Sequence, residues 1–170
     1  MANAVNNAGA RAGEKERIPL TREGYEEKRA RLTYLITERR REVADYIHEA
    51  KEAGDISESS AYEDAKNLQA MLEGEIQELQ QVLDNAVILE APIEEDGKRT
   101  VRLGATIEVE TDKGTTRTFM LVSTVEANSA GGKLSDQSPV GRALQGHSVG
   151  DKVEVNTPGG AVFYTVKAIR

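Results

Sequence analysis

Between residues 20 and 90, apolar residues recur at the three- and four-residue spacing of amphipathic helices. From Tyr25 onward they follow steps of seven, four and three, and no Gly or Pro interrupts residues 25 to 53; the positions are Leu32, Ile36, Val43, Ile47 and Ala50. Thr21 is a suitable helix N-cap, and Leu20 before it can pack back on the first turn. Gly54 then ends the run, as a C-terminal glycine commonly does. The pattern predicts one long, uninterrupted helix.

A second apolar stripe predicts a second helix of similar length. Its members are Ala61, Ala65, Leu68, Leu72, Leu79, Val82 and Ala86, with Ile76 and Leu83 beside it. Gly74 is the one weak helix former there, and Pro92 closes the segment. Two helices of about thirty residues joined by a short turn must run antiparallel, and at ~1.5 Å per residue each is roughly 45 Å long. Because a small core does not need this length, we expect a coiled-coil hairpin over residues 18–91 that serves to reach, with its tip near residues 54–60.

After Pro92 the spacing of the apolar residues changes to two. Residues 92–99 are polar and indicate a linker, and four alternating stretches follow at 106–110, 117–122, 152–155 and 162–166. Turn residues at 112–114 and 158–160 predict two β-hairpins, and Ser138-Pro139 predicts the start of a short helix that runs to Leu144. The fold class is therefore α+β: a helical hairpin followed by a small antiparallel sheet domain over residues 100–170 with one short helix. We expect residues 1–17, which are small and polar, to form a flexible tail.

Composition limits what such a protein can do. The 170 residues carry a net charge of −7, which argues against a general grip on nucleic acid, so any such contact should be local or arranged by a protein partner. No apolar run approaches the ~20 residues that cross a bilayer, and residues 1–17 lack the apolar region of a signal peptide. The absence of cysteine excludes disulfides and thiolate metal sites. We expect a cytoplasmic protein with no membrane contact.

The predicted tip is acidic, and its chemistry has two interpretations. Asp55 and Glu58 are three residues apart, which is the spacing of a capping box at a helix start, where the helix dipole also favours carboxylates. Ser57, Ser59 and Ser60 are equally suitable caps. The other interpretation is a pair of carboxylates for metal work. Two side chains cannot supply the about six oxygen ligands of magnesium, but they can complete the shell of an ion that a partner holds. Spacing alone favours the cap.

Other polar and aromatic residues near the tip are open to two interpretations as well. Lys51 and Lys66 flank the acidic turn, one on each helix, either as solvated lysines or as phosphate-binding groups. Tyr62 is either part of the hairpin seam or a platform on which a base stacks. His48 and His147 are far apart and have no Ser, Cys or Asp constellation around them, so we expect both to be surface histidines.

Several motifs, taken together, resemble a known family. The entry to the first helix has Pro19-Leu20-Thr21-x-x-Gly24-Tyr25; the tip has Ala50-Lys51-x-x-Gly54-Asp55-x-Ser57-Glu58 and then Ala61-Tyr62-x-x-Ala65-Lys66. The second half has Ser138-Pro139-Val140-Gly141-x-Ala143-Leu144-x-Gly146, Val149-Gly150-Asp151 and Val155-x-Thr157-Pro158-Gly159-Gly160. Each motif is weak alone. In this order and at these spacings, from about residue 18 to the end, they resemble the bacterial Gre transcript cleavage factors, most closely those of the GreA type.

The resemblance implies a function that spacing does not show. Gre factors are transcription elongation factors whose C-terminal domain, similar in fold to the FKBP prolyl isomerases, docks on RNA polymerase while the coiled coil enters the secondary channel. Asp55 and Glu58 match the tip carboxylates that help bind the polymerase's second catalytic Mg²⁺ and a water, so that the polymerase hydrolyses backtracked RNA. Lys51, Lys66 and Tyr62 match tip residues that meet the RNA 3′ end.

The resemblance also implies where the factor docks and what it lacks. The motif at residues 138–146 is assigned to polymerase docking through Ser138, Pro139, Gly141 and Leu144. The protein is then not an enzyme but a factor that stimulates the polymerase's own endonuclease activity. It has no cofactor of its own, because the polymerase holds the Mg²⁺, and it is expected to be a monomer.

The tip departs from the usual family pattern, which leaves alternatives open. Ser59-Ser60-Ala61-Tyr62 replaces the common Asn-Ala/Gly-Glu/Gly-Tyr, and Glu63 and Asp64 make this tip more acidic than most. One alternative is a channel-binding inhibitor of RNA polymerase without cleavage activity, which the intact Asp55/Glu58 pair disfavours. A second is a prolyl isomerase or chaperone, for which the sheet domain offers only three aromatic residues as a pocket lining: Phe119, Phe163 and Tyr164. A third is a hairpin adaptor with no chemistry.

Overall fold

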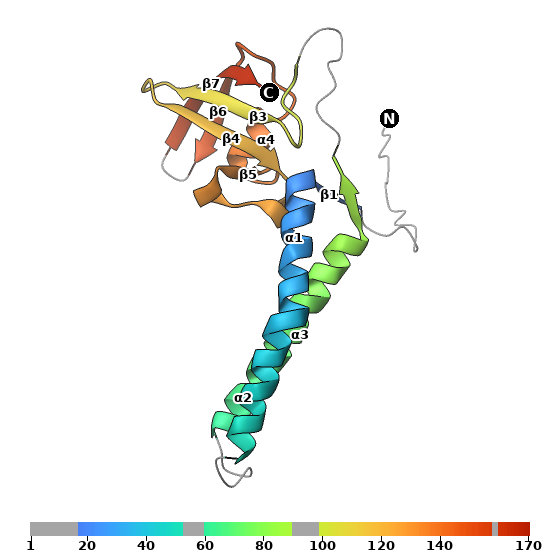
Figure 1. Cartoon of the computed structure of the whole chain (residues 1–170). Coiled ribbons are helices and arrows are strands. Elements are labelled where there is room, and N and C mark those ends of the chain that lie inside the picture. Colours follow the sequence, from blue (N-terminus) through green and yellow to red (C-terminus); the bar gives the residue numbers. More distant parts are fainter. Residues whose placement is uncertain (1–16, 53–59, 90–98, 158–159) are drawn as a thin grey trace, which may run out of the picture.

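The computed structural model describes residues 17–52, 60–89, 99–157 and 160–170, which form a long helical hairpin joined at its root to a small sheet domain (Figure 1). The outgoing arm comprises α1 (Arg22–Tyr34), the π-helical turn η1 (Leu35–Arg39) and α2 (Arg40–Glu52), and the return arm is α3 (Ser60–Asp84). The predicted antiparallel hairpin is thereby confirmed. Among the described helices, none is both long and apolar enough to span a membrane.

The π-helical turn decides which residues face the seam of the hairpin. A π turn closes its hydrogen bonds one residue later than an α turn, so it shifts the apolar stripe by one position. Leu35 is 1% exposed, whereas Ile36, which the sequence pattern assigns to the seam, is 37% exposed. The prediction of an uninterrupted α-helix is therefore wrong at this turn. The buried seam cluster is Leu35, Val43, Leu72 and Ile76, against which Leu32, Ile47, Leu68 and Leu79 pack.

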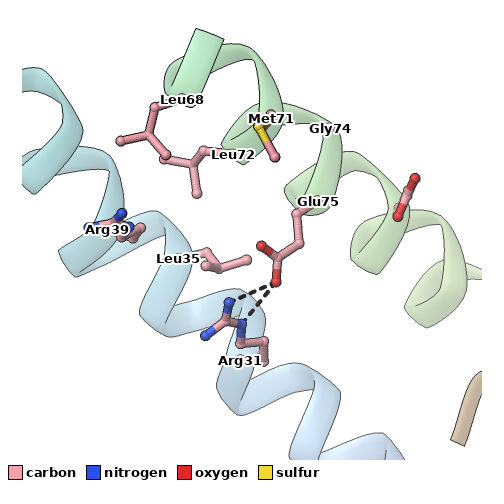
Figure 2. A pocket seen from close by; sticks show the side chains of 9 residues that line it. Arg31, Leu35, Arg39, Leu68, Met71, Leu72, Gly74 and Glu75 are labelled. Carbon is pink, nitrogen blue, oxygen red and sulfur yellow. Dashed lines mark hydrogen bonds and ion pairs between the residues drawn. The ribbon is translucent and has the colours of Figure 1, made fainter. Parts of the chain in front are cut away.

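Two ion pairs connect the arms on either side of the π turn. The Arg31 side chain reaches Glu75 at 2.9 Å across an open groove of about 470 Å³ that Leu35 also lines (Figure 2). Arg40 makes a two-pronged contact with Glu73, its Nε donating to Oε1 at 2.9 Å and its Nη2 to Oε2 at 2.6 Å. Exposed pairs of this kind contribute about 0–1 kcal/mol each, so the seam carries most of the packing energy.

At the root of the hairpin, the chain forms a strand pair that the sequence pattern does not predict. β1 (Ile18–Leu20) runs parallel to β2 (Ala86–Ile88), with Ile18 opposite Ala86. α3 therefore ends at Asp84, and the predicted second stripe continues too far, because Ala86 belongs to a strand. Strands of three residues are too short to show an alternating pattern. Leu20, the predicted packing residue, is fully buried.

The second part of the chain is a five-stranded sheet in the order β5-β4-β3-β7-β6. Its strands are β3 (Thr106–Thr111), β4 (Thr116–Val122), β5 (Lys133–Ser135), β6 (Lys152–Thr157) and β7 (Gly160–Ile169). The two predicted hairpins, β3–β4 and β6–β7, are confirmed as antiparallel pairs. β5 was not predicted, and its pairing with β4 is parallel. The sheet is therefore mostly, and not wholly, antiparallel.

The short helix α4 (Pro139–Leu144) covers the core of this sheet, as predicted. Ser138 is its N-cap, with Oγ accepting a hydrogen bond from the Gly141 amide at 2.9 Å, and Pro139 occupies the first turn. Leu144 is fully buried in the core. The other buried members of that core are Val101, Ala105, Ile107, Val109, Leu121, Val153, Val155, Tyr164, Val166 and Ile169. Along β3, β6 and β7 as far as Val166, these residues occupy every second position, with less buried residues between them, which is the spacing that the sequence pattern detects.

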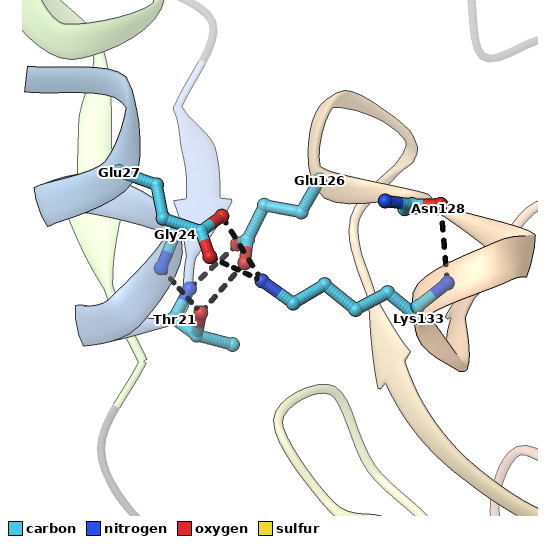
Figure 3. Close-up of polar contacts among 7 residues, drawn as sticks. Thr21, Gly24, Glu27, Glu126, Asn128 and Lys133 are labelled. Atoms are coloured by element: carbon cyan, nitrogen blue, oxygen red, sulfur yellow. Dashed lines mark hydrogen bonds and ion pairs between the residues drawn. The ribbon is translucent and has the colours of Figure 1, made fainter. Parts of the chain in front are cut away.

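A carboxylate from the sheet domain joins the two parts of the molecule. Glu126, at the end of the 3₁₀ turn η3 (Thr124–Glu126), accepts hydrogen bonds from the Thr21 amide and the Thr21 hydroxyl, both at 2.6 Å (Figure 3). Thr21 is itself the predicted N-cap of α1, and its Oγ1 accepts from the Gly24 amide at 2.9 Å. Lys133 of β5 lies 3.1 Å from Glu27 of α1 beside this contact. The start of α1 is thus held from outside the hairpin.

The shift caused by the π turn predicts unequal effects of two neighbouring truncations. Leu35→Ala removes a buried side chain and should lower the free energy of unfolding by about 2–5 kcal/mol, whereas Ile36→Ala should change it by no more than about 1 kcal/mol. Urea unfolding of the full chain, followed by far-UV circular dichroism, measures both. A larger loss for Ile36→Ala than for Leu35→Ala would show that the first arm is an unbroken α-helix.

The Arg40–Glu73 pair predicts a pH dependence. The hydrogen bond and the charge of Arg40 lower the pKa of the Glu73 carboxyl below its ordinary value. A carboxylate whose pKa is depressed on folding stabilises the protein above the ordinary pKa, and that contribution is lost as pH falls through the depressed value. In a carboxyl-resolved NMR titration the pKa of Glu73 should lie below the ordinary value of a glutamate, and in Arg40→Gln it should rise towards that value. An unchanged Glu73 titration in that variant would exclude the pairing.

Candidate functional site

The far end of the hairpin brings together two of the residues assigned to RNA contact. Lys51, in the last turn of α2, places its Nζ 5.8 Å from the ring centroid of Tyr62 in the first turn of α3. This is within the distance of a cation–π contact, which holds an ammonium over an aromatic face. Lys51 is exposed and Tyr62 is half-buried. Tyr62 therefore lies where the two arms meet, with the positive charge of the opposite arm above it.

Two small residues allow the arms to approach closely at this end. Ala50 is 5% exposed and Ala65 is fully buried, and each directly precedes a lysine, Lys51 or Lys66. Because consecutive helical residues point about 100° apart, burial of the alanines directs both lysines to the flanks of the hairpin. Lys66 is exposed, and its Nζ donates to Gln69 Oε1 at 2.6 Å on the same helix.

The charge at this end is mixed. Glu63 and Asp64, the acidic departures from the family pattern, are exposed on the first turns of α3. Carboxylates there are favoured by the positive end of the helix dipole, so they also stabilise the start of α3. His48 lies one turn before the end of α2, with Nε2 3.3 Å from Glu52, and is exposed as predicted.

The two carboxylates assigned to catalysis, Asp55 and Glu58, lie outside the described residues, as do Gly54 and Ser57. Their place in the chain is between Glu52, the last residue of α2, and Ser60, the first of α3. Within the described part of the chain, no group of three or more His, Asp or Glu side chains is arranged to hold a metal ion. The roles assigned to Asp55 and Glu58 therefore stay predictions.

The four residues assigned to polymerase docking fall into two groups. Leu144 is fully buried, and Gly141 is buried against the Ser135 carbonyl, which would be only 2.0 Å from a Cβ at that position. These two residues hold α4 on the sheet and offer a partner no side-chain surface. Pro139 is exposed and Ser138 is half-buried, so the start of α4 is the accessible part of the motif.

The three aromatic residues considered for an isomerase pocket do not converge on one face of the sheet. Tyr164 is 9% exposed in the core, while Phe163, next to it in β7, points to the opposite face, because side chains alternate along a strand. Phe163 lies under Lys152, whose Nζ is 4.8 Å from the ring centroid. Phe119 packs against the core from β4. The described sheet domain therefore has no pocket formed by all three rings.

The residues that join the two parts, Glu126 and Lys133, are not among the candidate residues that the sequence pattern indicates. Glu126 is only 7% exposed, yet it lies in a stretch without any periodic pattern. One signal was present: Gly24 stands in the first turn of a predicted helix, where glycine is a poor helix former. A glycine at such a position indicates that another group approaches the backbone closely.

The structure thus defines a class of protein in which a long helical hairpin with a charged far end is joined to a small sheet domain. Two family models cover these two parts: "Transcription elongation factor, N-terminal" matches residues 18–88, and "Transcription elongation factor, GreA/GreB, C-term" matches residues 96–170. The chain belongs to the GreA/GreB family of transcription elongation factors. Members of this family act on RNA polymerase and are not themselves enzymes.

Similar proteins extend over most of the chain. Transcription elongation factor GreA of Thermomicrobium roseum is 44% identical over 88% of this chain and 94% of its own length. The factor of the same name from Geobacillus kaustophilus is 39% identical over 94% of this chain and 99% of its own length. Among solved structures, GreA factor homolog 1 of Thermus thermophilus is 35% identical and covers 91% of this chain and 99% of its own, with a TM-score of 0.41.

Proposed function

We propose that this protein docks its sheet domain on RNA polymerase, places the hairpin in the secondary channel, and stimulates the polymerase to cleave backtracked RNA. The observation that carries the proposal is the correspondence between parts and matches: one family model spans the hairpin and the other spans the sheet domain. The charged far end of the hairpin supports the proposal, because the exposed groups there do not pack in the core of the protein and contribute little to its stability.

The division of labour at the tip follows from what its residues can do. Asp55 and Glu58 offer carboxylate oxygens in the segment between α2 and α3, where they can orient a water and complete the surroundings of an ion that the polymerase holds. That ion supplies Lewis-acid activation of the attacking water. Two exposed carboxylates cannot hold magnesium tightly alone, so we expect the protein to have no cofactor of its own.

The lysines and the tyrosine are suited to holding the RNA. Lys51 and Lys66 flank the hairpin end and are exposed, as phosphate-binding groups must be. The ring of Tyr62 lies 5.8 Å from Lys51 Nζ, so a base that stacks on this ring would bring its phosphate close to the lysine. We assign these three residues to the RNA 3′ segment and the exposed start of α4, at Ser138 and Pro139, to polymerase docking.

A channel-binding inhibitor is the second candidate function. The exposed Glu63 and Asp64 favour it, because they add negative charge at the end of the hairpin that would approach the polymerase's metal ions. The Asp55/Glu58 pair favours cleavage. An inhibitor would slow nucleotide addition and release no RNA fragment at any concentration.

A cleavage assay on stalled, backtracked elongation complexes tests the proposal. Added with magnesium, the protein should release short 3′ RNA fragments, and Asp55→Ala or Glu58→Ala should lower the maximal rate by about 100-fold or more, because each variant loses a group that positions the water. Lys51→Ala and Tyr62→Ala should lower it less, since the RNA keeps its other contacts.

A docking variant separates loss of chemistry from loss of binding. Asp55→Ala should compete with the unaltered protein at equal concentration, whereas Pro139→Glu, at an exposed position, should need a higher concentration to reach the same maximal rate. Normal cleavage by the Asp55→Ala/Glu58→Ala double variant would disprove the assignment of the tip. Failure of the unaltered protein to release fragments, together with slowed nucleotide addition, would establish the inhibitor instead.

A further inference from the structure

The buried carboxylate between the two parts of the molecule is held in one geometry. Glu126 is 7% exposed, and both of its carboxylate oxygens are used, Oε1 by the Thr21 amide and Oε2 by the Thr21 hydroxyl, each at 2.6 Å. These are short, charge-assisted hydrogen bonds at the positive end of the α1 dipole. A carboxylate buried in this way is costly unless it keeps its donors, so the sheet domain cannot rotate away from Thr21 without exposing or stranding the charge.

Gly24 shows how closely the backbone of α1 approaches this carboxylate. A Cβ at position 24 would lie 2.1 Å from Glu126 Oε2, which is far inside van der Waals contact. The clash is with the end of the Glu126 side chain, which can relieve it by shifting, but such a shift lengthens or breaks its two hydrogen bonds to Thr21. The observed contact between the first turn of α1 and the η3 turn therefore requires that position 24 has no side chain.

A second contact flanks the first and fixes rotation about it. Lys133, whose side chain is only 15% exposed, reaches both oxygens of Glu27 at 3.1 Å, one helical turn beyond Gly24. Lys133 is itself tied to the η3 segment, because its backbone exchanges two hydrogen bonds of 2.9 Å with Asn128. Two contacts at different positions along α1 restrain the direction of the helix axis. A single contact would allow the helix to rotate about it.

The same segment continues into the helix assigned to docking. Ser135, the last residue of β5, pairs its hydroxyl with that of Thr124 at 3.1 Å and accepts the Ser138 hydroxyl on its carbonyl at 2.7 Å. The Ser135 carbonyl is also the group against which Gly141 packs. Residues 123–144 thus connect the start of α1 to the start of α4 through contiguous hydrogen bonds and close packing.

From these contacts we infer that Glu126 is a positioning residue that fixes the direction of the hairpin relative to the docking surface, and thereby the place that the tip reaches. The inference rests on the proposed function for its consequence in cleavage. It names Thr21 and Gly24 as the other half of the contact, with Lys133 and Glu27 as its flank. None of these residues is among those assigned to contact with the RNA.

The length of the hairpin makes the contact consequential. With 25 residues in α3, the arm is roughly 37 Å long at ~1.5 Å per residue, so a rotation of about 5° at the root moves its far end by roughly 3 Å. A misplacement of about 1 Å can lower a catalytic rate by about 100-fold. Loosening of the root should therefore lower the maximal rate of cleavage while the docking surface is intact.

Matched variants of the full chain test this inference. Thr21→Val removes the hydroxyl and Thr21→Ser keeps it; Gly24→Ala introduces the clash, whereas Gly74→Ala places the same methyl on α3 where no heavy atom lies within 4 Å. Glu126→Gln removes the charge. Because the chain has no cysteine, Ala70→Cys on the hairpin and Lys113→Cys on the sheet domain admit a single pair of spin labels, and pulsed electron resonance then measures the distance between the two parts.

We expect Thr21→Val, Gly24→Ala and Glu126→Gln to broaden or shift the distance distribution and to lower the maximal cleavage rate by roughly tenfold or more. The concentration that gives half-maximal cleavage should change by less than about twofold, because α4 is untouched; this separation is not expected from general unfolding. Circular dichroism checks that each variant keeps its helix content. Thr21→Ser and Gly74→Ala should match the unaltered protein in both measurements.

Two results would overturn the inference: an unchanged distance distribution in Thr21→Val and Gly24→Ala, or a changed distribution with an unchanged maximal rate. A variant that loses its helix content is replaced by Glu126→Gln, to which the same criteria apply. If the unaltered protein releases no RNA fragment, the proposed function is wrong. The inference is then tested by two other measurements: the distance distributions of the variants and the degree to which each variant inhibits nucleotide addition.

Discussion

The arrangement of this molecule depends on one buried carboxylate. The hairpin and the sheet domain each have a core of their own, and neither core reaches into the other. They are joined by Glu126, which accepts two 2.6 Å hydrogen bonds from Thr21 and lies where a Cβ on Gly24 would collide with it, and beside this contact by the Lys133–Glu27 ion pair. A carboxylate buried between two parts of a molecule permits only one arrangement of them, because any arrangement that leaves the buried charge without its hydrogen-bond donors is destabilised.

The hairpin is long and narrow, so a small rotation at its root causes a large displacement at its far end. Its seam is narrow, its arms are linked by exposed pairs such as Arg40–Glu73, and its far end presents charged and aromatic groups that contribute little to stability. A hairpin of this kind is useful only if its root is fixed, since displacement at the end grows in proportion to its length. The short parallel strand pair β1–β2 and the Glu126 contact both act at that root. The specific contacts between segments distant in sequence thus lie at the root, where they determine the position of the far end.

The sequence predicted the parts with strong periodicity and missed those without it. The hairpin, four of the five strands of the domain sheet, the Thr21 cap and the Ser138-Pro139 start of α4 all follow local rules of spacing and capping. Leu35 was missed because a π turn shifts the stripe by one residue, and heptad spacing pointed to Ile36. The three-residue strands β1, β2 and β5 are too short to alternate visibly. Glu126 depends on a contact between residues more than a hundred positions apart, which no local pattern records.

At the site, the sequence places Lys51 and Tyr62 on either side of the predicted tip, but only the structure brings the two side chains together across the arms.

The most direct measurement is the structure of this protein bound to a backtracked RNA polymerase complex, determined by electron cryomicroscopy. We expect the Glu126 carboxylate to stay within hydrogen-bonding distance of the Thr21 amide and hydroxyl, with α4 on the polymerase surface and residues 53–59 beside the catalytic centre. A cleavage-competent complex in which the hairpin has turned away from Glu126, or in which residues 53–59 lie far from the catalytic centre, would disprove a hairpin root fixed by Glu126.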